Sequence, residues 1–255
     1  MIKYKGKEKY IAAIVAAAIV ALPVLSFNSQ AAEVTDPNII YQNTKKQTVT
    51  KGVTIENIVK FTKNGWYNIN VMTVDLSNKY ISVDSLTNTE SIGKLATTKK
   101  LATQRNAVAA VNASFFTPDG GGYGHPLGTV VQSSDILCAS SDFNRYSDAI
   151  ASFSIDKLNN AIINYWKVNM NLITRDGEKI PVAQYNKYNN SKFKDITVFD
   201  RKWGTKAVGA TEDIPDLFQM VVENGVVTKF LSGQPAAEIP ENGYVVVTRE
   251  EGAKT

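Results

Sequence analysis

The sequence holds only one cysteine and one histidine in its 255 residues. A single thiol, Cys138, excludes a disulfide within the chain and any zinc site built from thiolates. We expect Cys138 to be a small buried apolar residue. A lone histidine, His125, excludes the usual metal sites with several histidine ligands. Calcium held by oxygen atoms stays open, but the sequence has no calcium-loop signature. We therefore assign no metal ligand and leave the cofactor unknown.

Several sequence motifs are also missing. There is no Gly-x-Ser-x-Gly nucleophile elbow, no phosphate-binding loop and no dinucleotide fingerprint. Nor is there the basic stripe that nucleic acid would need. The net charge is +4, and residues 1–31 carry four Lys and one Glu, so the rest of the chain is near +1. We expect no nucleic-acid partner. With 44% hydrophobic and 20% charged residues, the composition is that of a globular protein.

The N-terminus has the pattern of a signal peptide. An apolar run, Ile11 to Leu25, follows a basic start, and Ser29-Gln30-Ala31 places small residues at a cleavage site. We predict cleavage after Ala31 and a secreted or cell-envelope protein. The alternative is an uncleaved membrane anchor, but this run is shorter than the ~20 residues of a membrane span.

The rest of the chain is rich in predicted strands. Residues 32–52 are polar and are expected to form a flexible leader, and 53–255 a single β-rich α+β domain with a mixed or antiparallel sheet and few helices. The helical spacing of Ser91 to Gln104 predicts one helix, and Ser133 to Ser147 is expected to be irregular. Strands are predicted at 53–61, 66–76, 80–86, 107–111, 129–132, 149–155, 161–168, 171–174, 196–199, 218–223, 226–230 and 244–248.

The stretch from Ala107 to Gly128 organises these elements. It begins as an uncharged run, Ala107 to Val111, which we interpret as a buried strand, and changes character at Asn112. Two phenylalanines follow, then four glycines within residues 120–124, and then His125. A polar loop held by a rigid sheet is a common ligand site. The alternative is a strand end capped by Asn112 and a plain glycine turn.

Each candidate residue in this stretch also has a structural explanation. Sugar hydrolysis usually needs two carboxyl groups, but Asp119, Asp135 and Asp142 lack a diagnostic partner and fit solvated loop positions as well. His125 could exchange a proton near neutral pH or make a loop-stabilising hydrogen bond. Phe115 and Phe116 should point to opposite sides of an extended backbone. One would enter the core and the other form an apolar wall, unless both pack in the core.

The segment Val111 to Phe116 (VNASFF), the glycine-rich run after it and Pro126-Leu127-Gly128 resemble the central motif of the phosphodiester glycosidase family. This family includes a lysosomal sugar-phosphodiesterase known as the uncovering enzyme and secreted bacterial proteins. The resemblance covers about Val53 to Val247. It implies hydrolysis of a sugar-1-phosphodiester that frees the sugar and leaves a phosphomonoester.

The resemblance maps the asparagine of the motif onto Asn112, its paired aromatics onto Phe115 and Phe116, and its loop glycine onto Gly128. The other candidates are taken from the same stretch of this chain. We take Asn112 and Asp119 as candidate catalytic residues. The candidate substrate-binding residues are Ser114, Phe115, Phe116, His125 and Gly128. Family members continue into a further glycine-rich motif, which nothing after Val247 matches. The domain is therefore expected to be incomplete at its C-terminus, with an unpaired sheet edge near Tyr244 to Thr248.

The sequence therefore predicts a secreted phosphodiester glycosidase-like hydrolase. Its expected partner is a carbohydrate or sugar-phosphate of the envelope or of an exopolysaccharide, with association with the cell wall. The alternative is a non-catalytic envelope module that binds glycan through the same loop. A purely structural β-domain is the third interpretation.

Overall fold

The computed structural model describes residues 36–118, 124–141, 150–188 and 193–249, together with 3–4 and 10–11. The predicted β-rich fold is confirmed, with one helix, α1 (Thr98–Gln104), in this part of the chain. The strands are β1 (Lys3–Tyr4), β2 (Tyr10–Ile11), β3 (Ile39–Thr50), β4 (Val53–Thr62), β5 (Gly65–Val74), β6 (Phe116–Pro118), β7 (Gly124–Pro126), β8 (Val130–Gln132), β9 (Asp135–Ser140), β10 (Ile150–Ile155), β11 (Ala161–Trp166), β12 (Met170–Ile173), β13 (Lys179–Val182), β14 (Gln184–Tyr185), β15 (Thr197–Phe199), β16 (Leu217–Glu223), β17 (Val226–Ser232) and β18 (Gly243–Arg249).

A seven-stranded mixed sheet forms the centre of the fold. Its strand order is β17-β16-β18-β15-β14-β9-β8. Only β14 and β15 run parallel, and the other neighbours are antiparallel. The strands β10 and β11, β12 and β13, and β6 and β7 form separate two-stranded hairpins. The mixed sheet therefore draws its strands from residues 130–249.

The last strand of the described chain lies inside this sheet. β18 pairs with β16 on one side and with β15 on the other, so the expected unpaired edge near Tyr244 to Thr248 is wrong. Val245 and Val247 point to one apolar cluster and Val246 to another. A strand buried on both faces gives a continuous apolar run rather than an alternating one, as this valine triplet does.

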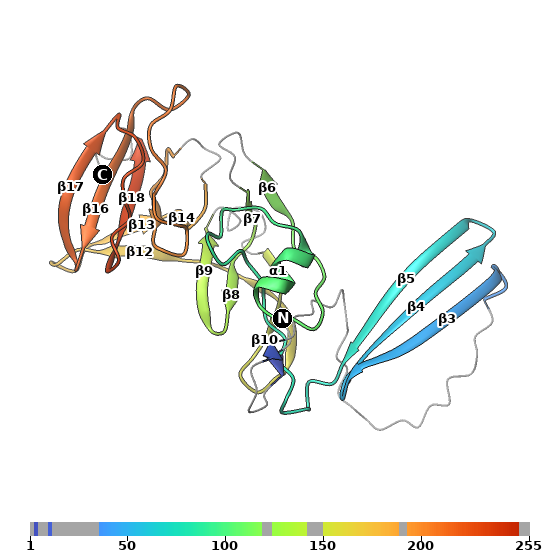
Figure 1. Cartoon of the computed structure of the whole chain (residues 1–255). Helices are drawn as coiled ribbons and strands as arrows, with labels where there is room; N and C mark the ends of the chain where they lie inside the picture. Colours follow the sequence, from blue (N-terminus) through green and yellow to red (C-terminus); the bar gives the residue numbers. More distant parts are fainter. Residues whose placement is uncertain are drawn as a thin grey trace.

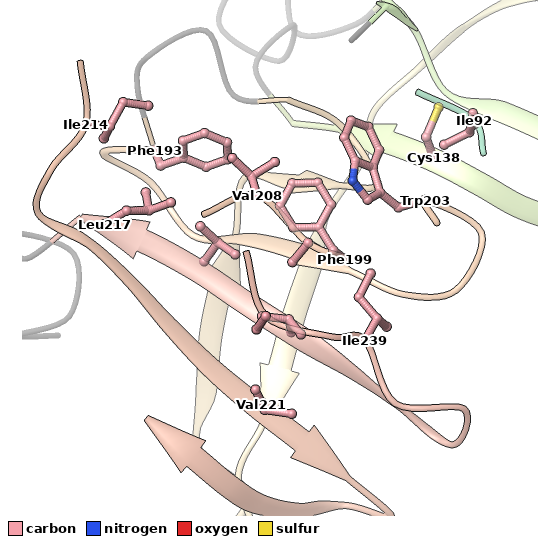
Figure 2. Packing of buried hydrophobic residues seen from close by; sticks show 14 of the residues in the cluster. Ile92, Cys138, Phe193, Phe199, Trp203, Val208, Ile214, Leu217, Val221 and Ile239 are labelled. Carbon is pink, nitrogen blue, oxygen red and sulfur yellow. The ribbon is translucent and has the colours of Figure 1, made fainter. Parts of the chain in front are cut away.

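The main core covers one face of the sheet and is centred on aromatic side chains (Figure 2). Trp203 is 1% exposed, and its ring lies 4.9 Å from that of Phe199. Cys138 is fully buried in the same cluster, as expected. On the opposite face Val198 and Val246 pack against Met170 and Leu172 of β12. The sheet is thus covered on both faces around β15 and β18.

The N-terminal part forms a second sheet, β3-β4-β5, which Figure 1 shows extending away from the rest of the molecule. The expectation of an unstructured leader over 32–52 is wrong where β3 occupies residues 39–50 and pairs with β4 along its length. The polar composition does not distinguish this strand from a loop, because both faces of β3 are largely exposed. A solvated antiparallel strand does not need apolar residues on both sides.

The structure confirms some of the predicted turns, strands and helix bounds and differs at others. The Asn224-Gly225 hairpin between β16 and β17 is confirmed, and both residues have positive φ, at 50° and 76°. Residues 80–86 form no strand, and β5 pairs with β4 instead. The helix is shorter than predicted because Thr97 caps it, its side chain accepting from Lys100 N. Residues 135–140, expected to be irregular, form β9.

Candidate functional site

The candidate site is a short hairpin, which we call the hairpin segment (residues 115–118 and 124–128). In it β6 pairs with β7, so that Phe116 lies opposite Pro126 and Thr117 opposite His125. The amide of Leu127 donates to the carbonyl of Phe115 at 3.0 Å. This pairing brings the predicted residues Phe115, Phe116, His125 and Gly128 into one local structure.

The stretch before the hairpin segment differs from the prediction. Residues 107–111 form no strand and none of them is buried, so the expected buried strand is wrong. Its alanine-rich, uncharged run packs only partly, with Ala109 contributing to a small cluster around Val53 and Ile81. The chain therefore reaches Asn112 as an extended loop next to helix α1, and not at the end of a sheet strand.

Asn112 is exposed and is held by α1. The hydroxyl of Thr98, the first residue of α1, donates to Asn112 Oδ1 at 3.0 Å. This contact fixes the orientation of the amide plane. Because the oxygen accepts from Thr98, the Asn112 nitrogen with its two protons is the part of the group suited to donate to a ligand.

The two phenylalanines are exposed together. The Phe115 side chain is 82% exposed and that of Phe116 is 53% exposed. The expectation that at least one of them enters the core is wrong, because the hairpin stands on the surface at this point. Exposed aromatic rings are costly to solvate, and ring faces of this kind suit the apolar face of a sugar.

His125 behaves differently, because it is 3% exposed. Burial, with Lys187 as a smaller contribution, lowers the pKa of His125 to about 4. The imidazole is therefore neutral at neutral pH, and the expected proton exchange near pH 7 is wrong for the protein as folded. Its β7 position, opposite Thr117 in the pairing, makes it a packing element of the hairpin segment.

Lys187 is a buried cation that the sequence did not reveal, since it sits in a stretch expected to be a plain loop. Its side chain is 1% exposed, and Nζ donates to the carbonyl of Leu127 in the hairpin segment. Buried lysines are rare unless their charge is compensated. Its charge acts to lower the pKa of both His125 and Cys138. Lys187 therefore lies directly next to the hairpin segment.

Asn186 directs Lys187 into this position. It is fully buried and has a φ of +50°, a conformation that asparagine tolerates better than most residues. Its Nδ2 donates to the carbonyl of Leu137 at 2.9 Å and to Asp200 Oδ1 at 2.7 Å. In return its Oδ1 accepts from Asp200 N at 2.9 Å.

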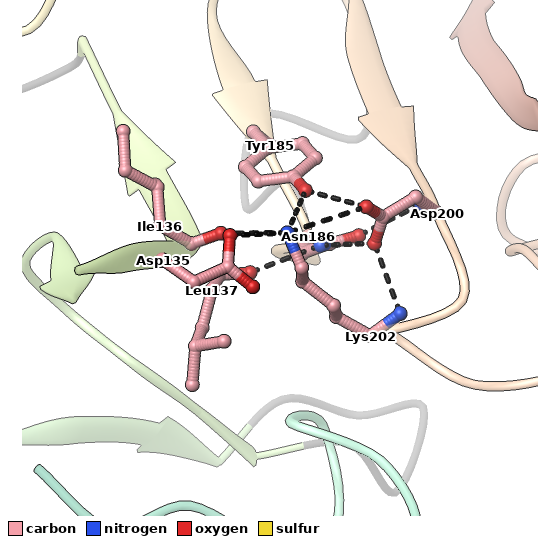
Figure 3. A network of polar contacts seen from close by, with 7 residues as sticks. All are labelled: Asp135, Ile136, Leu137, Tyr185, Asn186, Asp200 and Lys202. Atoms are coloured by element: carbon pink, nitrogen blue, oxygen red, sulfur yellow. Dashed lines mark hydrogen bonds and ion pairs between the residues drawn. The ribbon is translucent and has the colours of Figure 1, made fainter. Parts of the chain in front are cut away.

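These contacts belong to a wider polar network between β9, β14 and the end of β15 (Figure 3). The hydroxyl of Tyr185 donates to Asp200 Oδ2 at 2.5 Å, and burial and Asp200 raise the pKa of Tyr185. Lys202 Nζ donates to Asp135 Oδ1 at 2.9 Å. Asp135, one of the three candidate acids, is thus paired with Lys202, and its place in the network accounts for it structurally.

The remaining predicted residues are less informative. Ser114 is exposed and donates to the carbonyl of Phe115 at 3.2 Å. The carbonyl of Gly128 accepts from Cys138 Sγ at 3.8 Å. Asp119 and Asp142 lie outside the described residues. Gly124 lies against Leu95, where a side chain at this position would collide.

Two features are absent from the described residues. These residues contain no group of three or more His, Cys, Asp or Glu side chains placed to hold a metal ion. None of their helices is long and apolar enough to cross a membrane.

Comparison with known proteins gives the fold alone. No family model and no curated protein matches the chain. Among solved structures, a hypothetical protein from Synechocystis superposes with a TM-score of 0.65 at 19% identity, over 82% of this chain and 37% of the other. A “Putative exported protein” from Burkholderia pseudomallei gives a TM-score of 0.63 at 14% identity, over 86% and 66%. The chain thus shares its fold with two longer proteins.

Proposed function

We propose that this protein is a secreted phosphodiester glycosidase-like hydrolase. It cleaves the bond between a sugar and the phosphate of a sugar-1-phosphodiester, in glycans of the cell envelope or in exopolysaccharide. The products are the free sugar and a phosphomonoester. The resemblance of residues 111–128 to the phosphodiester glycosidase family gives the reaction type.

The observation that carries this proposal is the composition of the surface around the hairpin segment. Two exposed rings, Phe115 and Phe116, follow the amide of Asn112, and the buried cation Lys187 is bonded to the same hairpin. The aromatic rings can stack on the apolar face of a sugar. The amide nitrogen can donate to a phosphate oxygen or a hydroxyl, and the nearby positive charge favours an anionic substrate.

The roles of the other residues follow from their positions. Ser114 and Gly128 line the two ends of the hairpin segment as binding residues, and buried neutral His125 supports the hairpin. Asp119 remains the candidate acid or base on the strength of the sequence alone. Secretion is supported by the signal-peptide pattern of residues 1–31 and by the name, “Putative exported protein”, of a neighbour of similar fold.

A second candidate function is glycan binding without turnover. It is favoured by one observation: the described residues of the hairpin segment, 115–118 and 124–128, include no carboxylate. Glycosidases usually use two carboxyl groups at the scissile bond. Such a module would bind sugar-phosphate polymer through the same rings and amide.

The test is hydrolysis of a synthetic sugar-1-phosphate ester by the secreted protein and by Asn112→Ala. We expect the variant to lose roughly a hundredfold in rate, as when one donor to a developing anion is removed. The matched control is Asn171→Ala, an exposed asparagine on β12, which should keep full activity. Circular dichroism confirms that both variants fold.

Full activity in Asn112→Ala would contradict the role assigned to this residue. Ester binding without turnover by the wild-type protein would favour the binding module.

A further inference from the structure

The sheet β3-β4-β5 carries a second concentration of polar and aromatic side chains, far in sequence from the hairpin segment. In an antiparallel sheet, residues directly opposite one another share a face, and alternate residues along a strand do so too. The register therefore defines one face, which we call the aromatic-amide face. It consists of Tyr41, Asn43, Lys45, Asn57, Val59, Phe61, Trp66, Asn68 and Asn70.

Only one end of this side of the sheet is covered. Near the base, Val53 is fully buried and packs with Met72, Val74 and Ile81. Towards the far end the strands leave the body of the molecule (Figure 1). There Trp66 is 66% exposed and Tyr41 is 47% exposed. The apolar residues at the far end thus face solvent on a sheet anchored at its base.

The aromatic side chains at the far end form a cluster. The ring of Trp66 lies 4.8 Å from that of Phe61 at an angle of 32°, and 6.1 Å from that of Tyr41 at 64°. Phe61 is half-buried and lies between Tyr41 and Trp66 on the middle strand, so it supports the indole. Rings held in place by neighbours lose little entropy when a ligand stacks on them.

A row of amides continues from the rings along the same face. Asn57 Nδ2 donates to Asn68 Oδ1 at 2.9 Å and to Asn70 Oδ1 at 3.0 Å. Because the oxygens of the exposed Asn68 and Asn70 are used in this way, their nitrogens are directed to donate outward. From Trp66 to Asn70 the strand covers ~14 Å by its rise per residue. The row thus presents repeated donors to an extended, hydroxyl-rich chain.

The charge of this sheet differs from that of the rest of the protein. Residues 39–74 hold five lysines and one glutamate. Without them and without residues 1–31, the chain has 19 basic and 22 acidic residues. Lys46 pairs with Glu56 at 2.7 Å, on the opposite face. Lys45 lies opposite Asn57 on the aromatic-amide face, and Lys63 lies in the turn that precedes Trp66.

We propose that the aromatic-amide face binds a phosphate-bearing glycan chain, as a site separate from the hairpin segment. Trp66 and Tyr41 stack on sugar rings, the asparagines donate to hydroxyls, and Lys45 and Lys63 pair with phosphates. The charge complementarity of the sheet requires an anionic ligand. The choice of phosphate over carboxylate as the anion rests on the proposed function.

The test measures binding of the full chain to a purified poly(glycerol phosphate) wall polymer that carries sugar substituents. Trp66→Ala should weaken binding about tenfold, the loss of one good stacking contact. Trp166→Ala is the matched control, because Trp166 is also exposed, at 51%, but lies on β11. It should bind as the wild type does. Equal affinities in Trp66→Ala and Trp166→Ala would overturn the proposal.

Two lysine variants test the contribution of charge to binding. Lys45→Gln should weaken binding and reduce its dependence on salt, since a screened ion pair is lost. Lys229→Gln, at an exposed lysine of β17, should change neither. Comparable affinity for neutral dextran would overturn the requirement for an anion, and equal affinity for polygalacturonate would overturn the choice of phosphate.

Two outcomes separate this proposal from its alternatives. If Trp66→Ala changes the oligomeric mass in light scattering and leaves glycan affinity intact, the face is a contact between copies of this chain and the proposal fails. Asn112→Ala should lose hydrolysis, and adding Trp66→Ala to it should still weaken polymer binding, because the two sites are separate. If the wild type hydrolyses nothing but binding still depends on Trp66, the proposed enzyme activity fails and this proposal stands.

Discussion

Burial determines the chemistry of His125. In the unfolded chain its pKa would be near the ordinary value of 6.5, and in the folded protein it is about 4. Between these values the unfolded state binds more protons, so folding stability falls as the pH drops through this window. Below about pH 4 both states are protonated and the loss is complete.

We therefore predict that His125→Gln removes part of the acid sensitivity of folding. The wild type should lose up to about 3 kcal/mol of unfolding free energy between pH 6.5 and pH 4 through this group. Urea unfolding of both proteins at several pH values across the window measures this loss. Parallel pH profiles for the two proteins would contradict it.

Lys187 shows why some residues of the candidate site cannot be predicted from the sequence. It follows Tyr185 and Asn186 in a polar stretch that looks like any surface loop, yet its side chain is 1% exposed. Its position depends on bonds from Asn186 to residues 137 and 200, which are distant in sequence. The one local signal was the asparagine before it, a residue that tolerates positive φ.

At the scale of elements, local signals predicted local pairs. The Asn-Gly turn predicted the β16–β17 hairpin, alternation predicted β5, and the Asn-containing loop at 156–160 predicted the pair β10 and β11. Failures occurred where pairing was long-range or solvent-exposed. The polar strand β3 has no apolar period to detect, and residues 107–111 look like a buried strand but have no sheet partner. The hairpin segment was located by its motif, but the exposure of both phenylalanines was not predictable.

One element links the core to the candidate site, the turn at residues 91–95. Ser91 Oγ donates to the carbonyl of Trp203, and Ile92 N donates to the carbonyl of Lys202 at 3.1 Å. On the other side, Gly124 N in β7 donates to the carbonyl of Gly93 at 2.8 Å. The turn therefore fixes the position of the hairpin segment relative to the buried indole.

We predict that Gly93→Ala destabilises the protein by about 1–3 kcal/mol through overpacking. A Cβ there would lie 2.8 Å from Trp203 Cη2, and the indole is too deeply buried to move away. Urea unfolding measures the loss, and amide exchange at Gly124 should accelerate. An unchanged unfolding midpoint would show that the turn is not packed as described.

At the scale of the whole molecule, the stability of the fold depends on its last strand. Because β18 joins β15 to β16, residues 243–249 connect the two halves of the sheet. The resemblance to a longer family led to the expectation of an open edge here. The valine run of β18 is typical of a strand buried on both faces. Its sequence does not say which strands pair with it, because these neighbours come from residues 197–199 and 217–223.

We predict that Val247→Asp prevents stable folding, since Val247 is fully buried and a carboxylate there would cost several kcal/mol. Phe230→Asp is the control, because Phe230 is 63% exposed on the edge strand β17. Its effect should be about 1 kcal/mol, because the main loss is the contact of its ring with that of Phe218 at 5.8 Å. Thermal melts compare the two variants, and equal melting temperatures would contradict the central position of β18.

The most direct test of the account is the position of a heavy-oxygen label after reaction in ¹⁸O-water. The purified wild-type protein is incubated with a sugar-1-phosphodiester, and both products are analysed by mass spectrometry. A glycosidase adds water at the sugar, so the account predicts label in the free sugar and none in the phosphomonoester. Label in the phosphomonoester, or no products at all, would contradict it.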